Sequence, residues 1–456
     1  MKRKRFIKTT VAFATVAALN PLLSCKTETK KTVAEVEPES VRKNWAGNYT
    51  YKAKNLYEPK TVEEVQALIQ KLESQKALGS CHCFNNIADS PLNQISTKGL
   101  KGVISLNEED MTLIVGAGSK YGEFAPELHE RGYAVHNLAS LPHISVAGAC
   151  ATATHGSGVK NGNLATSIAA MELVDGKGGI IELKRGDEAF NGAVVNLGAL
   201  GIITKVTLDI QKTFDVRQDV FQNQPLNSLK ENFDAILSGG YSVSLFTDWQ
   251  DQLISQIWVK RRVDEEVKDL GDDYYGAKAA TRNLHPIVAL SAENCTEQMG
   301  VPGPWYDRLP HFKMGFTPSS GEELQSEFFV PRERALEAIL ALEKKRERIY
   351  PQLMITEIRT IAADDLWMSP CYGQDCVSIH FTWKQNPKEV GELIAMIETE
   401  LEPFQYRPHW GKLFSIAPSV LASRYEKLPE FIALAKQFDP SGKFKNDYLN
   451  LNIYPA

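Results

Sequence analysis

Gly79-Ser80-Cys81-His82-Cys83-Phe84-Asn85 is the stretch that says most about the architecture of this chain. It follows residues 62–71, whose apolar side chains recur at helical spacing and predict an amphipathic helix leading into a turn. A Gly-Ser turn lets backbone N–H groups approach an anion closely. A histidine on such a turn can be a metal ligand, a base, a covalent attachment point or simply a structural residue. This heptapeptide alone does not choose between them.

A second stretch narrows the choice. It reads Asn137-Leu138-Ala139-Ser140-Leu141-Pro142-His143-Ile144-Ser145-Val146-Ala147-Gly148-Ala149-Cys150-Ala151-Thr152-Ala153-Thr154-His155-Gly156-Ser157-Gly158. Most residues from position 139 onward are small or hydroxylated, which suits a backbone lying against a long phosphate-bearing ligand. The alternative is a Gly/Ala-rich buried strand and turn.

Together the two stretches resemble the FAD-binding domain of the vanillyl-alcohol oxidase type, the PCMH fold. Their sequence motifs are similar to those of the alditol oxidase branch (xylitol and sorbitol oxidases), which is related to the sugar-lactone oxidases. The shared motifs are Gly-Ser-x-His-x-Phe-Asn, Ala-Ser-Leu-Pro-His-Ile-Ser-Val-Ala-Gly and Thr-His-Gly-Ser-Gly. The resemblance runs from about residue 44 to the C-terminus.

This resemblance implies an α+β protein that binds FAD, with His82 as the covalent attachment point. The residues it implies for the cofactor are Gly79, Ser80, Cys81, His82, Cys83, Phe84, Ser140, Ser145, Gly148, Thr152, Ala153, Thr154, His155, Ile202 and His409. Cys81 and Cys83 depart from the family, which usually has Gly or Arg at the first position and Ser at the second. A cysteine as the flavin attachment point is the weaker alternative.

Composition limits the other classes of function. The 456 residues are 43% hydrophobic and 23% charged, as in an ordinary globular protein. A formal net charge of −5 argues against a nucleic-acid partner. The seven cysteines are not spaced like a zinc site, so we expect no metal. Cys371 and Cys376 could form a disulfide, and the sequence leaves this open.

The N-terminus has the pattern of an export signal. Residues 1–24 begin with basic side chains, continue with a short apolar region and end in Leu22-Leu23-Ser24-Cys25, which resembles a bacterial lipobox. We predict an exported cell-envelope lipoprotein, on the periplasmic face or the cell surface, with lipid on Cys25 as its only membrane contact. Residues 25–43 are expected to be a flexible tether. Whether export uses the Sec or the twin-arginine route stays open.

Two domains are predicted after the tether, an FAD-binding domain at 44–208 and a substrate cap at 209–456. We expect strands at 102–106, 112–115, 168–174, 179–183, 202–208, 243–249, 254–261, 353–361 and 377–383. Expected helices cover 62–71, 121–131, 332–344, 389–401 and 421–438, and residues 263–284 are expected to be irregular. The glycines at 116, 118 and 122 lack the spacing of a dinucleotide-binding Rossmann motif.

The predicted cap carries polar groups on two strands. Glu357 and Arg359 are two residues apart and project from one strand face, as do His380 and Thr382. Buried charge is costly unless it is paired, so this face indicates a site. The alternative is an internal Glu–Arg pair beside a structural histidine.

The resemblance assigns roles to these positions, because the alditol oxidase pattern has Glu-x-Arg, His-x-Thr and His-Trp-Gly-Lys. By this comparison the polyol hydroxyls are held by Ser140, Glu357, Arg359, Thr382 and Lys412. Arg359 and Lys412 would also stabilise negative charge at the reactive carbon, and His380 is the predicted base.

We therefore predict FAD-dependent oxidation of the primary alcohol of an acyclic polyol to the aldose, with O₂ reduced to H₂O₂ by a monomer. One alternative is a sugar-lactone oxidase or a dehydrogenase that uses another electron acceptor. Another is a carbohydrate-binding lipoprotein without catalysis.

Overall fold

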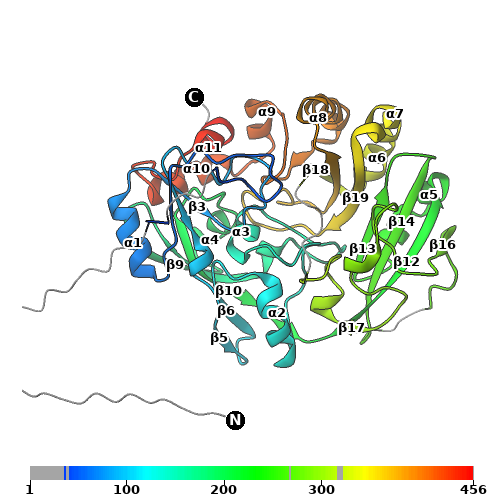
Figure 1. The fold of residues 1–456 in the computed structure, drawn as a ribbon, viewed down its shortest axis with the longest axis horizontal. Coiled ribbons are helices and arrows are strands. Elements are labelled where there is room, and N and C mark those ends of the chain that lie inside the picture. The colour runs from blue at the N-terminus through cyan, green and yellow to red at the C-terminus, as the bar shows by residue number, and fades with distance from the viewer. Residues whose placement is uncertain (1–34, 37–40, 266–268, 316–321, 455–456) are drawn as a thin grey trace, which may run out of the picture. The chain divides into compact units, whose positions relative to one another are not determined.

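Three larger sheets and a two-stranded one, covered by helices, make up the described part of the structure, a computed structural model (Figure 1). It describes residues 35–36, 41–265, 269–315 and 322–454, all of which belong to one compact unit, Val33–Ala456. The predicted signal peptide, Cys25 and most of the tether lie outside the described residues. In the part that is described, no helix is both long and apolar enough to cross a membrane.

The first sheet places the Gly79–Asn85 stretch. Its strands run in the order β1 (Glu35–Val36), β2 (Asn55–Tyr57), β4 (Asn93–Ser96) and β3 (Gln75–Leu78), and β2, β4 and β3 are parallel. Helix α1 (Val62–Lys71) connects β2 to β3, and Thr61 caps its N-terminus. The turn that contains His82 therefore leaves the carboxyl end of a parallel strand, where ligands commonly bind in α/β sheets.

The second sheet is antiparallel and confirms five predicted strands with small changes at their ends. Its order is β5 (Val103–Asn107), β6 (Thr112–Gly116), β10 (Ile202–Asp209), β8 (Ile168–Val174) and β9 (Ile180–Lys184). Helices α2 (Tyr121–Glu130), α3 (Val146–Ala151) and α4 (Phe190–Val194) belong to this half of the chain, and β7 (Tyr133–Ala134) pairs with β11 (Gln211–Lys212). Helix α3 puts the small-residue stretch against the His82 turn.

A ten-stranded sheet forms most of the second half of the chain. Along it lie β15 (Asp273–Tyr274), β16 (Ala277–Ala279), β12 (Asp215–Pro225), β14 (Leu253–Arg262), β13 (Ser242–Thr247), β19 (Leu353–Ile361), β20 (Cys376–Lys384), β18 (Glu323–Pro331) and β21 (Arg407–Pro408), and β17 (Gly303–Pro304) pairs with β12. Its helices include α5 (Leu226–Leu237), α6 (Ala335–Glu343), α7 (Arg346–Ile349) and α8 (Pro387–Leu401).

Three expectations for this half were wrong in detail. The helix expected at 421–438 is two helices, α9 (Pro418–Ser423) and α10 (Leu428–Phe438), because Pro429 fits only the first turn of a helix. The helix expected at 332–344 begins with a 3₁₀ turn over Arg332–Arg334. The segment 263–284, expected to be irregular, contains β15 and β16, which extend the sheet beyond β12.

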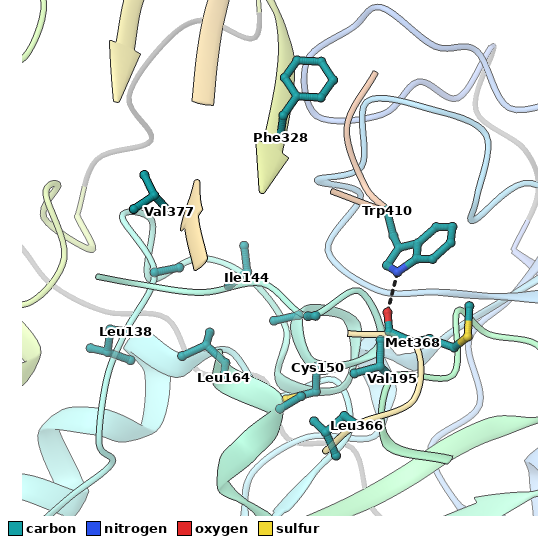
Figure 2. Packing of buried hydrophobic residues seen from close by; sticks show 14 of the residues in the cluster. Leu138, Ile144, Cys150, Leu164, Val195, Phe328, Leu366, Met368, Val377 and Trp410 are labelled. Atoms are coloured by element: carbon teal, nitrogen blue, oxygen red, sulfur yellow. Dashed lines mark hydrogen bonds between the residues drawn. The ribbon is translucent and has the colours of Figure 1, made fainter. Parts of the chain in front are cut away.

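The two halves share one hydrophobic core. Leu138, Ile144, Cys150, Leu164 and Val195 from the first half belong to the same buried cluster as Phe328, Leu366, Met368, Val377 and Trp410 from the second (Figure 2). The indole Nε1 of Trp410 donates to the carbonyl of Met368 at 2.6 Å.

The chain also returns at its end to the first half. Helix α11 (Asp447–Asn452) is capped by Asn446, whose amide donates to the carbonyls of Asn86, Ile87 and Asp89. The predicted domain boundary at residue 208 stays a prediction.

Candidate active site

A cavity of about 530 Å³ lies between the His82 turn, the small-residue stretch and the ten-stranded sheet. Most of the predicted site residues line it: Gly79, Ser80, Cys81, His82, Cys83, Phe84, Ser140, Gly148, Thr152, Thr154, His155, Glu357, Arg359, His380, Thr382, His409 and Lys412. The predicted residues Ser145, Ala153 and Ile202 are buried just outside this lining. Ile202 packs in a core cluster, while its neighbours Gly201 and Ile203 reach the cavity.

The His82 ring is positioned by an aromatic contact. It stacks on Trp45, with ring centroids 5.3 Å apart and planes inclined by 22°. Both ring nitrogens are buried and have no partner among the described residues. Burial, followed by the charge of a protonated His143, lowers the pKa of His82 to about 4, so the imidazole is neutral at physiological pH. Two buried ring nitrogens without hydrogen-bond partners cost folding free energy unless a ligand in the cavity contacts them.

The backbone of the turn lies very close to the start of α3. A Cβ added to Gly79 would lie 2.6 Å from Oγ of Ser145, and one added to Gly148 would lie 2.8 Å from the same atom. The Ser145 N–H donates to Oγ of Ser80 at 3.0 Å, whereas Oγ of Ser145 is buried and finds no partner in the part of the chain that the structure describes. Cys81 adopts a left-handed conformation with φ of 63°, which any residue other than glycine adopts at a cost.

The cap side of the cavity is built on β19 and β20. Glu357 and His380 are cross-strand partners, so the predicted polar face exists as a continuous surface. The guanidinium of Arg359 donates from Nη2 to Oε1 of Glu327 at 2.8 Å and from Nη1 to the His155 carbonyl at 3.3 Å. The same Nη1 lies 3.5 Å from Oγ of Ser140, so Arg359 reaches the loop that contains Ser140.

Electrostatics fix the charge states of this face. Burial opposes ionisation of Glu357, but Arg359 and His311 outweigh it and hold its pKa below the usual range. The pKa of Arg359 is raised, although its burial acts in the opposite direction, because Glu357 and Glu327 lie beside it. Arg359 therefore stays charged and orients its neighbours rather than accepting a proton.

His380 shares one acceptor with Lys412. Nε2 of His380 lies 3.1 Å from Oε1 of Gln325, to which Nζ of Lys412 also donates, and Nε2 and Nζ are 3.4 Å apart. Nδ1 of His380 is buried and has no partner among the described residues. Burial and then the charge of Lys412 lower the pKa of His380 to about 3. His380 is consequently unprotonated at neutral pH and can accept a proton.

Sequence reasoning missed the β18 residues of the site. Glu327 is buried and accepts from Arg359 and from Nε2 of His155 at 3.0 Å, and Gln325 contacts His380 and Lys412. The alternation Glu323-Leu324-Gln325-Ser326-Glu327-Phe328 was the available signal, because it places three polar side chains on one strand face. His311, in a loop, also lines the cavity and bonds to Glu357, and no local pattern marks it.

Two regions of the chain match family profiles. Residues 53–184 match the profile described as an FAD binding domain, and residues 320–452 match that of D-arabinono-1,4-lactone oxidase. The chain is 45% identical to an alditol oxidase of a Streptomyces species over 413 residues, which are 89% of this chain and 97% of that protein. The chain belongs to the alditol oxidase family. It is a PCMH-type, FAD-dependent oxidoreductase.

Other members of the wider group are more distant than this alditol oxidase. An L-gulono-1,4-lactone dehydrogenase of Mycobacterium tuberculosis is 28% identical, over 90% of this chain and 99% of that protein. The L-gulonolactone oxidase of Mus musculus is 25% identical over 90% of this chain. The crystal structure of cholesterol oxidase from B. sterolicum matches with a TM-score of 0.76 at 15% identity, covering 95% of this chain and all of that one, which shows a shared fold. The predicted α+β, PCMH-type fold is confirmed.

The alditol oxidase fold brings together a site that fits FAD. The His82 nitrogens, the close glycine backbone and the Ser145 hydroxyl, all without hydrogen-bond partners among the described residues or too crowded for a side chain, line or adjoin one cavity. Lys76 and Gly198 also line this cavity, and the buried Lys76 amine donates to the carbonyls of Leu197, Gly198 and Phe444. The cavity thus offers polar backbone and an imidazole on its wall.

Proposed function

We propose that the protein oxidises the primary alcohol of an acyclic polyol, such as xylitol or sorbitol, to the aldose and reduces O₂ to H₂O₂. The observation that carries this proposal is the set of five polar side chains, Glu357, Arg359, His380, Thr382 and Lys412, that face the His82 turn across one cavity. The 45% identity to an alditol oxidase over nearly the whole chain supports the same substrate class.

In this proposal the cap residues bind and orient the polyol. The Glu357 carboxylate accepts a hydroxyl hydrogen bond, and Arg359 and Lys412 donate to substrate oxygens. Thr382 and Ser140 add a hydroxyl from each side of the cavity. Glu357, Arg359 and Thr382 lie on strands β19 and β20, whereas Ser140 and Lys412 lie in loops beside them. The strands hold the substrate in one orientation, which contributes to rate by positioning.

Proton removal falls to His380. Nδ1 of this neutral ring takes the hydroxyl proton, because Nε2 donates to Oε1 of Gln325 and Nδ1 has no partner among the described residues. The charges of Arg359 and Lys412 stabilise negative charge as it develops on the substrate oxygen. Bound FAD supplies the acceptor for the hydride and the route of electrons to O₂. The Glu327 carboxylate keeps Arg359 in place through the 2.8 Å ion pair.

A second candidate is a sugar-lactone oxidase or dehydrogenase. The match of residues 320–452 to the D-arabinono-1,4-lactone oxidase profile favours it, whereas the higher identity to an alditol oxidase favours the polyol. Peroxide release should be measured in air with xylitol, sorbitol and L-gulono-1,4-lactone at equal concentrations. We expect the polyols to be turned over. Glu357→Gln should lower the rate of peroxide release on the order of 100-fold. Turnover with the lactone alone would favour the second candidate.

We also propose that His82 carries FAD covalently, through a ring nitrogen bonded to the 8α-methyl carbon. The neutral ring with two free nitrogens supports this, since a nucleophile needs a lone pair. Burial raises the pKa of Cys81 and, to about 12, that of Cys83, which disfavours attachment through a thiolate. The new C–N bond would replace a C–H bond of the methyl group and the N–H bond of the imidazole, and the two electrons and two protons released would reduce O₂ to H₂O₂.

Acid denaturation tests this attachment. Flavin absorbance should stay with the wild-type polypeptide, map to the peptide that contains His82 and be lost from the polypeptide in His82→Ala. Complete release of FAD from the wild-type protein would rule the link out.

Export is a further proposal, supported by the basic residues 2–5 and Leu22-Leu23-Ser24-Cys25. We propose a monomeric enzyme body held at the cell envelope by lipid on Cys25. Mass spectrometry of the mature N-terminus should find lipidated Cys25, and Cys25→Ser should accumulate as an unlipidated precursor. A mature N-terminus elsewhere in the chain would contradict the proposal.

A further inference from the structure

Behind Glu357 a line of buried polar side chains runs away from the cavity. Nε2 of His311 lies 2.7 Å from Oε1 of Glu357, and Nδ1 of His311 lies 3.1 Å from Nζ of Lys260. Lys260, on β14, is 1% exposed, and His311 is 5% exposed. Neither residue belongs to the motifs that identify the family site, and Lys260 does not line the cavity.

The hydrogen-bond directions in this line can be assigned from donor and acceptor counts. Nζ of Lys260 contacts three acceptors, the carbonyls of Leu309 and Pro310 and Nδ1 of His311. An ammonium has three N–H donors and matches all three. Nδ1 of His311 therefore accepts, and the ring proton sits on Nε2, from which it is donated to the Glu357 carboxylate.

The His311 ring is fixed from several sides. Its centroid is 5.1 Å from the ring of Trp258 and 5.5 Å from that of Phe246, both in edge-to-face orientation. The His311 backbone N–H donates to the carbonyl of Ser140 at 3.1 Å. One loop residue thus contacts a substrate-side group from each half of the cavity, the Glu357 carboxylate and the Ser140 backbone.

We propose that His311 and Lys260 are positioning residues for Glu357: Lys260 orients His311, and His311 holds Oε1 of the carboxylate, so that Oε2 faces the substrate. Among the described residues Oε2 has no hydrogen-bond partner, in keeping with this role. The inference rests on the proposed function, because it assigns the support of the carboxylate that binds a polyol hydroxyl.

The charged neighbours explain why two residues are needed. Burial, and then the charge of Lys260, lower the pKa of His311 to about 4, while Glu357 acts in the opposite direction and Arg359 in the same direction as Lys260. Burial lowers the pKa of Lys260 to about 7, and Arg359 acts in the same direction, while Glu357 and Cys295 act in the opposite direction. Without Lys260, the pKa of His311 would be higher. A protonated His311 would then form an ion pair with Glu357 and neutralise the carboxylate charge that faces the substrate.

Anaerobic stopped-flow reduction by xylitol separates binding from chemistry in four variants. In His311→Phe, which keeps an aromatic ring, the apparent Kd should rise on the order of 10- to 100-fold, as expected when a hydrogen bond to a charged group is lost. His311→Gln, which can place an N–H near the former Nε2, should recover most of that loss. When Lys260→Met is combined with His311→Phe, the apparent Kd should rise by less than about twofold beyond that of His311→Phe alone, because Lys260 acts through His311. His129→Phe, whose ring contacts Thr213 and Tyr306, is the control and should behave as wild type.

A second readout needs no polyol. Nitrogen-15 NMR of histidine-labelled protein should give His311 as a neutral ring with its proton on Nε2, and Lys260→Met should raise the pKa of this ring. Unchanged xylitol binding in folded His311→Phe, or an unchanged His311 titration in Lys260→Met, would overturn the proposal. If no polyol reduces the wild-type flavin while the His311 titration shifts as expected, the proposed function fails, whereas the coupling between Lys260 and His311 stands.

Discussion

Replacing Glu327 by Gln should destabilise the protein measurably at neutral pH. Oε1 of Glu327 accepts from Nη2 of Arg359 at 2.8 Å and from Nε2 of His155 at 3.0 Å, and the side chain is 2% exposed. A hydrogen bond with a charged partner contributes ~1.5–3 kcal/mol and a neutral one ~0.5–1.5 kcal/mol. Two bonds that each lose about 1–1.5 kcal/mol predict a loss of ~2–3 kcal/mol in the free energy of unfolding.

The pH dependence of this loss has a definite sign. The pKa of Glu327 lies well below its usual range, because His155 and Arg359 outweigh the opposing effect of burial. A depressed folded-state pKa adds stability that is fully present above the unfolded pKa of about 4.3 and is lost as pH falls through the folded value. The difference between wild type and Glu327→Gln should thus be constant between about pH 5 and 8 and shrink below about pH 4.

Urea denaturation followed by tryptophan fluorescence, at matched flavin content, provides the assay. Glu337→Gln is the matched control, since Glu337 pairs with Arg334 at 2.9 Å on the surface and should change stability by less than ~0.5 kcal/mol. Equal stability of Glu327→Gln and wild type at pH 7, or a difference that grows on acidification, would refute the reasoning.

Three further predictions concern the cavity walls. Lys412→Met should lower the rate of flavin reduction on the order of 100-fold. Because Lys412 lowers the pKa of His380, the same variant should raise that pKa and shift the acid limb of the pH–rate profile to higher pH. Gly79→Ala should reduce the flavin-to-protein absorbance ratio, because its Cβ would lie 2.6 Å from Oγ of Ser145; Gly391→Ala, with nothing within 4 Å, should keep full flavin. Cys81→Gly should retain the flavin and raise the free energy of unfolding by about 0.5–1 kcal/mol, because φ at this position is 63°; unchanged or lower stability in urea denaturation would contradict the strain argument.

Much of the fold was predictable because periodicity reports local structure well. Helix α1 and strands β8 and β19 begin and end where their apolar patterns do. Strands β3 and β4 carry no such pattern, since their buried polar residues, such as Gln75 and Lys76, are explained only by distant partners. Strand β12 was likewise missed.

The candidate site was predictable where motifs carry it and not where tertiary contacts do. The Glu-x-Arg and His-x-Thr pairs lie on adjacent strands, and Lys412 joins them. Glu327 and His311 reach the same cavity from β18 and from a loop, and only the folded chain shows that they bind Arg359 and Glu357. Cys371 and Cys376, for which the sequence allows a disulfide, are free thiols in the structure.

Anaerobic addition of xylitol to the purified protein is the most direct test of its activity. The absorbance of the oxidised flavin near 450 nm should bleach in a single turnover, about one aldose should form per flavin, and air should restore the colour with release of H₂O₂. A flavin that stays oxidised with xylitol and sorbitol, yet is reduced by a sugar lactone, would contradict the account.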